Sequence, residues 1–212
     1  MPIIFQHSPQ DKPLLAVWKI TEPCDFFETK VPTGRTIAHP QVQLRHLAAR
    51  YVLAELQPGF PYHQIEIASA GKPYLPNSTM QFSLTHCGDY AAAILSNAGA
   101  VGIDLEERGD RIFRIRHKFL SDEEQELICV KTSLTDLQEG LVASEWLTRA
   151  WSAKESVYKW YGEGSVDFTR DIVLSGMDTD AQQLEFSFTP TGSLLRINYR
   201  SIEQLELTWI AP

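Results

Sequence analysis

The chain has 212 residues, and because domains commonly run to roughly 100–200 residues this length corresponds to one large domain or two compact halves. A hydrophobic fraction of 43% and a charged fraction of 22% provide for a sizeable core and exclude intrinsic disorder, collagen and coiled coil. The formal net charge of −8 argues against a general nucleic-acid binder, which needs a basic surface, so we expect no nucleic-acid partner.

The number of cysteines and the length of the apolar runs indicate the cellular compartment of the chain and whether it crosses a membrane. Cys24, Cys87 and Cys129 are too few and too scattered for a disulfide framework or a Cys-rich zinc site. The longest purely apolar run, residues 91–95, is too short to span a bilayer, and the first residues lack the pattern of a signal peptide. We therefore expect a soluble, cytoplasmic protein with no membrane partner.

The first half combines one long helix with short strands. Residues 14–20 are predicted as a strand, and residues 41–57 as an amphipathic helix that has proline at its start and Pro58-Gly59 at its end. Further strands are predicted at residues 65–68, 81–85 and 90–96.

The second half opens with a strand at residues 101–106, after the turn residues 97–99. Ser121 and Glu124 have the spacing of a capping box, which predicts a helix running to about residue 130 and followed by a polar loop. A longer helix is predicted at residues 141–161, ended by Gly162 and Gly164. Antiparallel strands are predicted at residues 184–188, 194–199 and 205–210. We expect an α+β protein of two similar halves, residues 1–99 and 100–212.

The strand at residues 101–106 carries two carboxylates. Asp104 and Glu106 stand at i and i+2, which places both side chains on one face of a strand. Carboxylates held together in this way repel each other unless a cation lies between them, and ligation by oxygen alone suits Mg²⁺ better than zinc. The alternative is a solvent-facing acidic edge, with Ile103 and Leu105 in the core.

The helix at residues 141–161 carries a second candidate set. Trp151, Glu155 and Lys159 lie at i, i+4 and i+8 and therefore share one face. By spacing alone, the alternative of a surface Glu–Lys pair next to a core tryptophan is favoured.

The pairing of the two segments, about 50 residues apart, is more specific than either one. The sequence resembles the 4′-phosphopantetheinyl transferase superfamily, whose hallmark is a (V/I)-G-(I/V)-D-x-E strand followed by a W-S-x-K-E-x-x-x-K helix. The matching pieces here are Val101-Gly102-Ile103-Asp104-Leu105-Glu106 and Trp151-Ser152-Ala153-Lys154-Glu155 with Lys159. The length resembles that of the surfactin-type branch, which implies a pseudo-dimer of two similar halves and a monomeric protein.

A third element extends the resemblance into the first half. The segments Gly71-Lys72-Pro73 and Phe82-Ser83-Leu84-Thr85-His86 resemble the family's G-K-P…F-N-x-S-H pattern. Ser83 replaces the usual asparagine, which puts one structural hydrogen bond in question, whereas Thr85 replaces serine and keeps the hydroxyl. Arg50 stands at a frequently basic position of the first long helix. Upstream of residue 42 no motif aligns, and Lys30 and Arg35 are only candidates for CoA binding.

The resemblance implies that the phosphopantetheine arm of coenzyme A is moved to a serine of an acyl- or peptidyl-carrier protein, with release of 3′,5′-ADP. It implies Mg²⁺ held by Asp104, Glu106 and Glu155, and catalytic roles for Asp104, Glu155 and Lys159. It further implies CoA binding by Arg50, Lys72, Thr85, His86 and Lys154, with Lys154 or Lys159 on phosphate oxygens. Two alternatives stay open: a non-catalytic CoA- or carrier-binding module, and a metal-dependent CoA pyrophosphohydrolase.

The densest basic run follows the carboxylate strand. Residues 108–118 include Arg108, Arg111, Arg114, Arg116 and Lys118 in an otherwise acidic chain. One hypothesis is that this run docks the acidic helix of a carrier protein. The alternative is a solvated loop or helix face.

Overall fold

The computed structural model describes residues 2–8, 13–32 and 37–212, and it contains two main antiparallel sheets. The first has the order β1-β2-β6-β5 and the second β7-β11-β10-β9-β8, with a small β3-β4 pair beside the first. The first sheet consists of β1 (Ile3–His7), β2 (Leu14–Lys19), β5 (Gln81–Cys87) and β6 (Tyr90–Ser96). The second consists of β7 (Gly102–Glu107), β8 (Ile172–Asp178), β9 (Gln183–Phe188), β10 (Ser193–Ile202) and β11 (Leu205–Ile210). The small pair is β3 (Glu66–Ile67) and β4 (Pro73–Tyr74).

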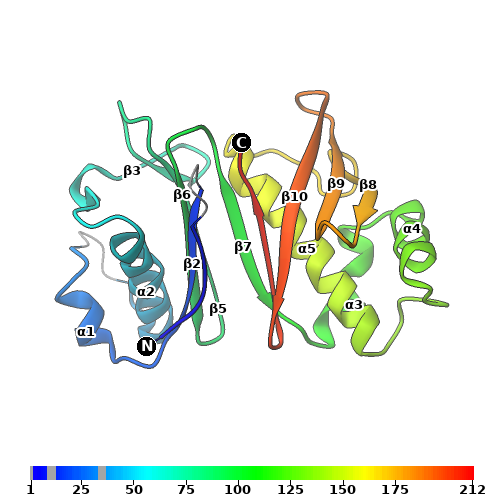
Figure 1. Ribbon diagram of the computed structural model, residues 1–212, viewed down its shortest axis with the longest axis horizontal. Coiled ribbons are helices and arrows are strands. Elements are labelled where there is room, and N and C mark those ends of the chain that lie inside the picture. Colours follow the sequence, from blue (N-terminus) through cyan, green and yellow to red (C-terminus); the bar gives the residue numbers. More distant parts are fainter. Residues whose placement is uncertain (1, 9–12, 33–36) are drawn as a thin grey trace.

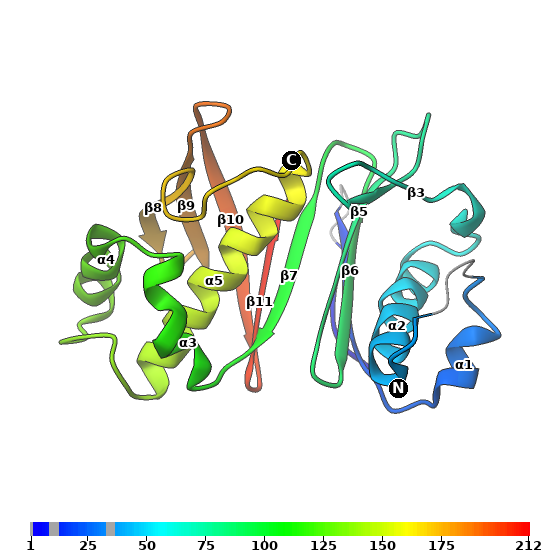
Figure 2. The ribbon, with the colours of Figure 1, turned by 180° about the vertical axis from the view of Figure 1, so that it is seen from behind.

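The helices cover the outer faces of the two sheets (Figure 1). Helices α1 (Cys24–Glu28) and α2 (Pro40–Leu56) lie against the first sheet. Helix α5 (Leu141–Tyr161) crosses the second sheet, with α3 (Arg111–Ile115) and α4 (Asp122–Thr132) beside it (Figure 2). Short 3₁₀ turns occur at Tyr62–Gln64 and Arg116–Lys118. None of the helices in the described part of the chain is long and apolar enough to cross a membrane.

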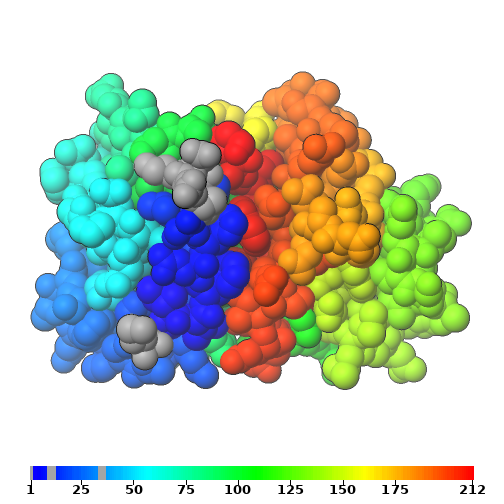
Figure 3. Space-filling model, viewed as in Figure 1, coloured from blue at the N-terminus to red at the C-terminus, as the bar shows by residue number. Residues whose placement is uncertain are grey.

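The inner faces of the two sheets pack on each other, which gives four layers in the order helix, sheet, sheet, helix. Leu15, Val17 and Ile94 of the first sheet meet residues of β7 and β11 such as Ile103 and Leu207 in one buried cluster. In the space-filling view the N-terminal strands, in blue, lie directly against the C-terminal strands, in red (Figure 3). This apolar contact joins the two halves of the chain.

The position of strand β6 explains why its sequence is so apolar. Ala92 and Ile94 face the second sheet, whereas Ala93 and Leu95 face α2 and its neighbours. A strand covered on both faces buries every side chain, so it lacks the alternation of a half-exposed strand. The apolar run at residues 91–95 is therefore a central strand.

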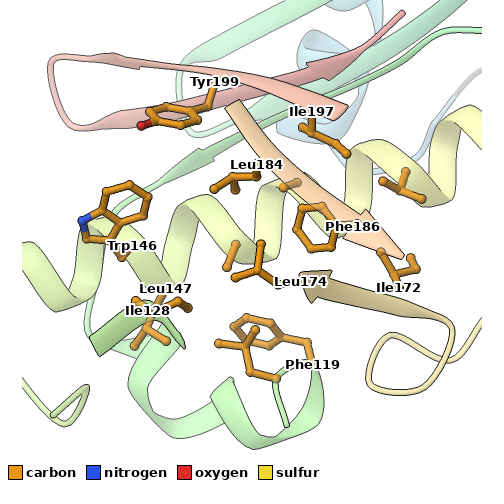
Figure 4. Packing of buried hydrophobic residues seen from close by; sticks show 14 of the residues in the cluster. Phe119, Ile128, Trp146, Leu147, Ile172, Leu174, Leu184, Phe186, Ile197 and Tyr199 are labelled. Carbon is orange, nitrogen blue, oxygen red and sulfur yellow. The ribbon is translucent and has the colours of Figure 1, made fainter. Parts of the chain in front are cut away.

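The second half has its own core on the other face of its sheet (Figure 4). Phe119, Leu147, Phe186 and Ile197 are buried there between α5 and β8–β10. Helix α4 is positioned by its first turn, since Ser121 and Glu124 form the predicted capping box.

The two halves share one order of elements. In the first, β2 is followed by α2 and the hairpin β5-β6, and β6 pairs antiparallel with β2. In the second, β7 is followed by α5 and, after two added strands, by the hairpin β10-β11, and β11 pairs antiparallel with β7. The predicted α+β class is confirmed; the pseudo-dimer and the division between residues 99 and 100 remain predictions that this shared order supports.

Candidate functional site

A cavity of about 660 Å³ lies where the edge strand β5 of the first sheet meets the edge strand β7 of the second. Helix α2 and the β3-β4 region close one side, and α5 closes the other. The predicted site residues that line it are Arg50, Lys72, Thr85, His86, Asp104, Glu106, Glu155 and Lys159. Residues from both halves of the chain thus converge on one cavity.

Close packing of α5 on β7 brings the two motifs together. Gly102, Asp104 and Glu106 alternate along β7 and face α5. A Cβ atom on Gly102 would overlap the backbone of Ser156 and Trp160 in α5, so only glycine allows the helix to lie this close. The glycine of the strand motif therefore sets the distance between the carboxylates of β7 and the charged face of α5.

Asp104 is the most deeply buried of the three carboxylates. Its Oδ1 lies 2.6 Å from Lys159 Nζ and accepts a hydrogen bond of 3.0 Å from the hydroxyl of Thr85. Its Oδ2 is buried and has no hydrogen-bond partner. One oxygen of this carboxylate is therefore satisfied by the protein, and the other is not.

Burial and the crowding of the carboxylates change the pKa values of Glu106 and Glu155. Glu106 accepts hydrogen bonds from the indole of Trp151 and the thiol of Cys87. Burial, together with the charge of Asp104, raises the pKa of Glu106 and raises that of Glu155 to about 7. Three acidic groups in one buried place favour a cation.

The residues partly fit a magnesium site. The donor set consists of carboxylate oxygens, which Mg²⁺ prefers, and the buried Oδ2 of Asp104 is an unused donor atom. Among the described residues, however, no three His, Cys, Asp or Glu side chains are arranged to hold a metal by themselves. Because Mg²⁺ in phosphate-binding sites keeps waters and takes ligands from the substrate, one or two protein carboxylates are sufficient.

Strand β5 contributes through Ser83 as well as Thr85. The hydroxyl of Ser83 accepts a hydrogen bond of 3.3 Å from the backbone N–H of Ile103, so it links β5 to β7. Serine at this position therefore makes a hydrogen bond across the junction of the two halves.

Lys72 connects the first half to the end of α5. Its Nζ donates a hydrogen bond of 2.9 Å to the carbonyl oxygen of Trp160, and burial lowers its pKa. The side chain passes Gly162, which ends α5 with φ of 74°. A cation at this point also satisfies the negative end of the helix dipole.

The structure places Lys154, for which CoA binding is predicted, outside the cavity lining. This side chain is fully buried in the second half, away from the cavity lining. Its ammonium lies 2.6 Å from Glu124 Oε1 and donates to the carbonyl oxygens of Phe119 and Phe168. Burial lowers its pKa to about 8. Lys154 therefore ties α4 and two loops to α5.

Lys30, one of the two upstream candidates for CoA binding, does not line the cavity. The Lys30 ammonium lies 5.0 Å from the centre of the Phe26 ring, and Arg35 lies outside the described residues. Two polar lining residues, His46 and Tyr158, were not predicted from the sequence. His46 is one turn before Arg50 and shares a hydrogen bond with it, and Tyr158 is three residues after Glu155, so helical spacing alone would have found both.

The basic run divides into paired and exposed residues. Arg108 forms ion pairs with Glu206 and Glu145, and Arg116 is hydrogen-bonded to Gln125 and to a carbonyl of its own segment. Arg111, Arg114, His117 and Lys118 are exposed.

Comparison with known families gives one match. A model described as the 4′-phosphopantetheinyl transferase superfamily covers residues 100–209, more than half of the chain, including both β7 and α5. No curated protein matches the sequence.

Proposed function

Because the chain belongs to the 4′-phosphopantetheinyl transferase superfamily, we propose that it transfers 4′-phosphopantetheine from coenzyme A to a serine of an acyl- or peptidyl-carrier protein. The serine oxygen forms a bond to the β-phosphorus, the pyrophosphate bond breaks, and 3′,5′-ADP leaves. The observation that carries this proposal is the convergence of Asp104, Glu106, Glu155 and Lys159 in one cavity at the junction of the two halves.

We propose that Asp104, Glu106 and Glu155 hold Mg²⁺ together with oxygens of the pyrophosphate. The unpartnered Oδ2 of Asp104 and the crowding of the three carboxylates support this assignment. When bound, the metal would neutralise charge on the phosphate groups, the main requirement of phosphoryl transfer.

The other lining residues have roles that follow from their positions. Glu155 faces the cavity from α5 and is the proposed general base for the carrier serine. Lys159 is the proposed contact for phosphate oxygens, since it is a cation at the same wall. Arg50, Lys72 and His86 are proposed to bind CoA. Thr85 is proposed to contribute to the CoA site by orienting Asp104 through its hydrogen bond.

We also propose that the protein acts as a monomer of the surfactin-type branch. Both halves of a single chain line the cavity, so no second copy is needed to complete it. Three free cysteines fit the expected cytoplasmic location.

The exposed part of the basic run is the proposed carrier-docking surface, defined by Arg111, Arg114, His117 and Lys118. Reversing Arg111 and Arg114 to glutamate should raise the KM for the carrier more than the KM for CoA, because these side chains are exposed and do not line the cavity proposed for CoA. The matched control is the pair Arg196→Glu and Arg200→Glu on β10, outside the cavity lining. Equal changes in both KM values would contradict docking at this surface.

Mass spectrometry of an apo carrier protein incubated with CoA, Mg²⁺ and this protein tests the proposed activity. We expect a gain of roughly 340 Da, the mass of one phosphopantetheine group, that is lost with EDTA and with Glu155→Ala. Release of 3′,5′-ADP without a carrier would instead indicate a pyrophosphohydrolase. CoA binding with no transfer to any acyl- or peptidyl-carrier protein would indicate a binding module.

A further inference from the structure

The ammonium of Lys159 forms an ion pair with Asp104, one of the proposed metal ligands. The Nζ atom is 2.6 Å from Oδ1 of Asp104, in a pair whose carboxylate side chain is almost completely buried. The same positive charge partly offsets the rise that burial causes in the pKa of Glu106 and of Glu155, so it acts on all three carboxylates. Lys159 is thus already a counter-cation for the carboxylate cluster.

A divalent metal bound to Asp104 would compete with this ammonium. Two cations held within a few ångströms of one carboxylate repel each other strongly, and low-dielectric surroundings increase that repulsion. Thr85 also donates to Oδ1, which leaves Oδ2 as the open donor atom, on the same carboxylate group as the ammonium. Metal binding therefore requires Lys159 to move away or costs free energy.

Lys159 has both the freedom and the place to move. Its side chain is 27% exposed and lines the cavity near the C-terminal end of α5. Lysine carries its charge on a flexible four-carbon stem that can redirect its three donors. A pyrophosphate in the cavity would offer the ammonium new anionic partners.

We propose that Lys159 is a tethered counter-cation that weakens metal binding until CoA draws the ammonium onto its pyrophosphate. This inference rests on the proposed function, because it needs CoA in this cavity. By linkage, any factor by which CoA strengthens metal binding is also the factor by which the metal strengthens CoA binding. The site would then assemble metal and CoA together, and would not hold the metal tightly beforehand.

Titration of the protein with Mn²⁺, followed by the electron paramagnetic resonance signal of the unbound ion at pH 8, tests this role directly. Without CoA, Lys159→Gln should bind Mn²⁺ about tenfold more tightly than the wild type, because the competing charge is removed. Lys159→Arg keeps the charge and should bind like the wild type. Lys131→Met on α4 removes one exposed charge outside the cavity lining and should leave Mn²⁺ affinity unchanged.

The effect of CoA on Mn²⁺ affinity provides the second measurement. CoA should increase the Mn²⁺ affinity of the wild type by a larger factor than that of Lys159→Gln. Unchanged or weaker Mn²⁺ binding by Lys159→Gln without CoA would overturn the inference, as would equal CoA effects on both proteins. Transfer to the carrier by the wild type is scored separately, so the proposed activity can hold while this inference fails, and the reverse outcome is equally visible.

Discussion

Thr85 is buried, and its hydroxyl donates a hydrogen bond to the carboxylate of Asp104 across the junction of the two halves. Thr85→Val keeps the shape but removes this donor. We expect kcat to fall about tenfold while the KM for CoA stays within about twofold, because a hydrogen bond to a charged group is worth roughly 1.5–3 kcal/mol.

Steady-state kinetics with CoA as the varied substrate checks this expectation. Thr85→Ser, which retains the hydroxyl and introduces the residue usual in the family, is the matched control and should keep most of the activity. If Thr85→Val raised the KM for CoA and left kcat unchanged, the hydroxyl would belong to CoA binding and not to Asp104.

Lys154 provides the opposite case, a motif residue whose role is structural. Lys154→Met leaves Glu124 buried without its ion-pair partner, which costs roughly 3–5 kcal/mol of unfolding free energy. Urea denaturation should show this loss, and the double variant with Glu124→Gln should recover part of it. The folded variant should keep a KM for CoA close to that of the wild type. A normal stability with a strongly raised KM would restore Lys154 to the CoA site.

Helical phase explains why Lys154 does not line the cavity beside the neighbouring motif residues. At about 100° per residue, Lys154 lies outside the arc of α5 that carries the lining residues Glu155, Tyr158 and Lys159. Glu155, Tyr158 and Lys159 share the face toward the cavity. The two-part motif identified the right segments, but a list of motif residues does not distinguish a residue that faces the site from one that anchors the helix.

At the level of elements, the approach of α5 to β7 depends on Gly102. Gly102→Ala should separate the helix from the strand, because the added Cβ meets backbone atoms that cannot turn aside. We expect a destabilisation of roughly 1–3 kcal/mol, typical of overpacking, and a larger relative loss of kcat than of CoA affinity.

Thermal unfolding and transfer kinetics of Gly102→Ala, compared with Gly109→Ala, test this role. A Cβ on Gly109 would meet no atom within 4 Å, so that control should be close to the wild type. If both variants behaved alike, close packing at Gly102 would not be what positions α5.

Two tyrosines in and beside α2, Tyr51 and Tyr62, should make the stability of the fold depend on pH. Burial raises the pKa of Tyr51 and of Tyr62 to about 12, from an ordinary value of 10.0. Above pH 10 the unfolded chain loses protons that the folded chain keeps, so stability should fall as pH rises from 10 to 12 and should not depend on these groups below pH 10. Urea titrations at several pH values check this, and Tyr62→Phe should flatten the fall. An equally steep fall in that variant would show that other groups cause it.

Elements with strong periodicity or end signals were predictable from the sequence. Helix α5 and strand β11 have the predicted bounds, and α4 begins at its capping box. The missed elements lack such signals: α1 and α3 have five residues each, too few to show a helical period. Strand β8 is interrupted by a bulge next to Gly176, which hides its alternation. The cavity itself follows from how two edge strands meet, and no local pattern encodes that.

At the scale of the whole molecule, the apolar contact between the two sheets determines how the halves behave. Leu207 is part of that contact and is fully buried. Leu207→Ala should lower the unfolding free energy by roughly 2–5 kcal/mol, the usual cost of a cavity in a core. Leu194→Ala, at a side chain that is 60% exposed, is the control and should change it by less than about 0.5 kcal/mol.

Because both halves share this core, we expect one unfolding transition, with far-ultraviolet circular dichroism and tryptophan fluorescence changing together in the wild type and in Leu207→Ala. Trp18 reports on the first half and Trp146 on the second, so independent halves would give two steps. The cavity is lined by residues of both halves, and CoA should therefore stabilise the single transition as a whole. Stabilisation of one of two separate steps would instead mean that the halves fold independently and that the cavity forms only when they dock.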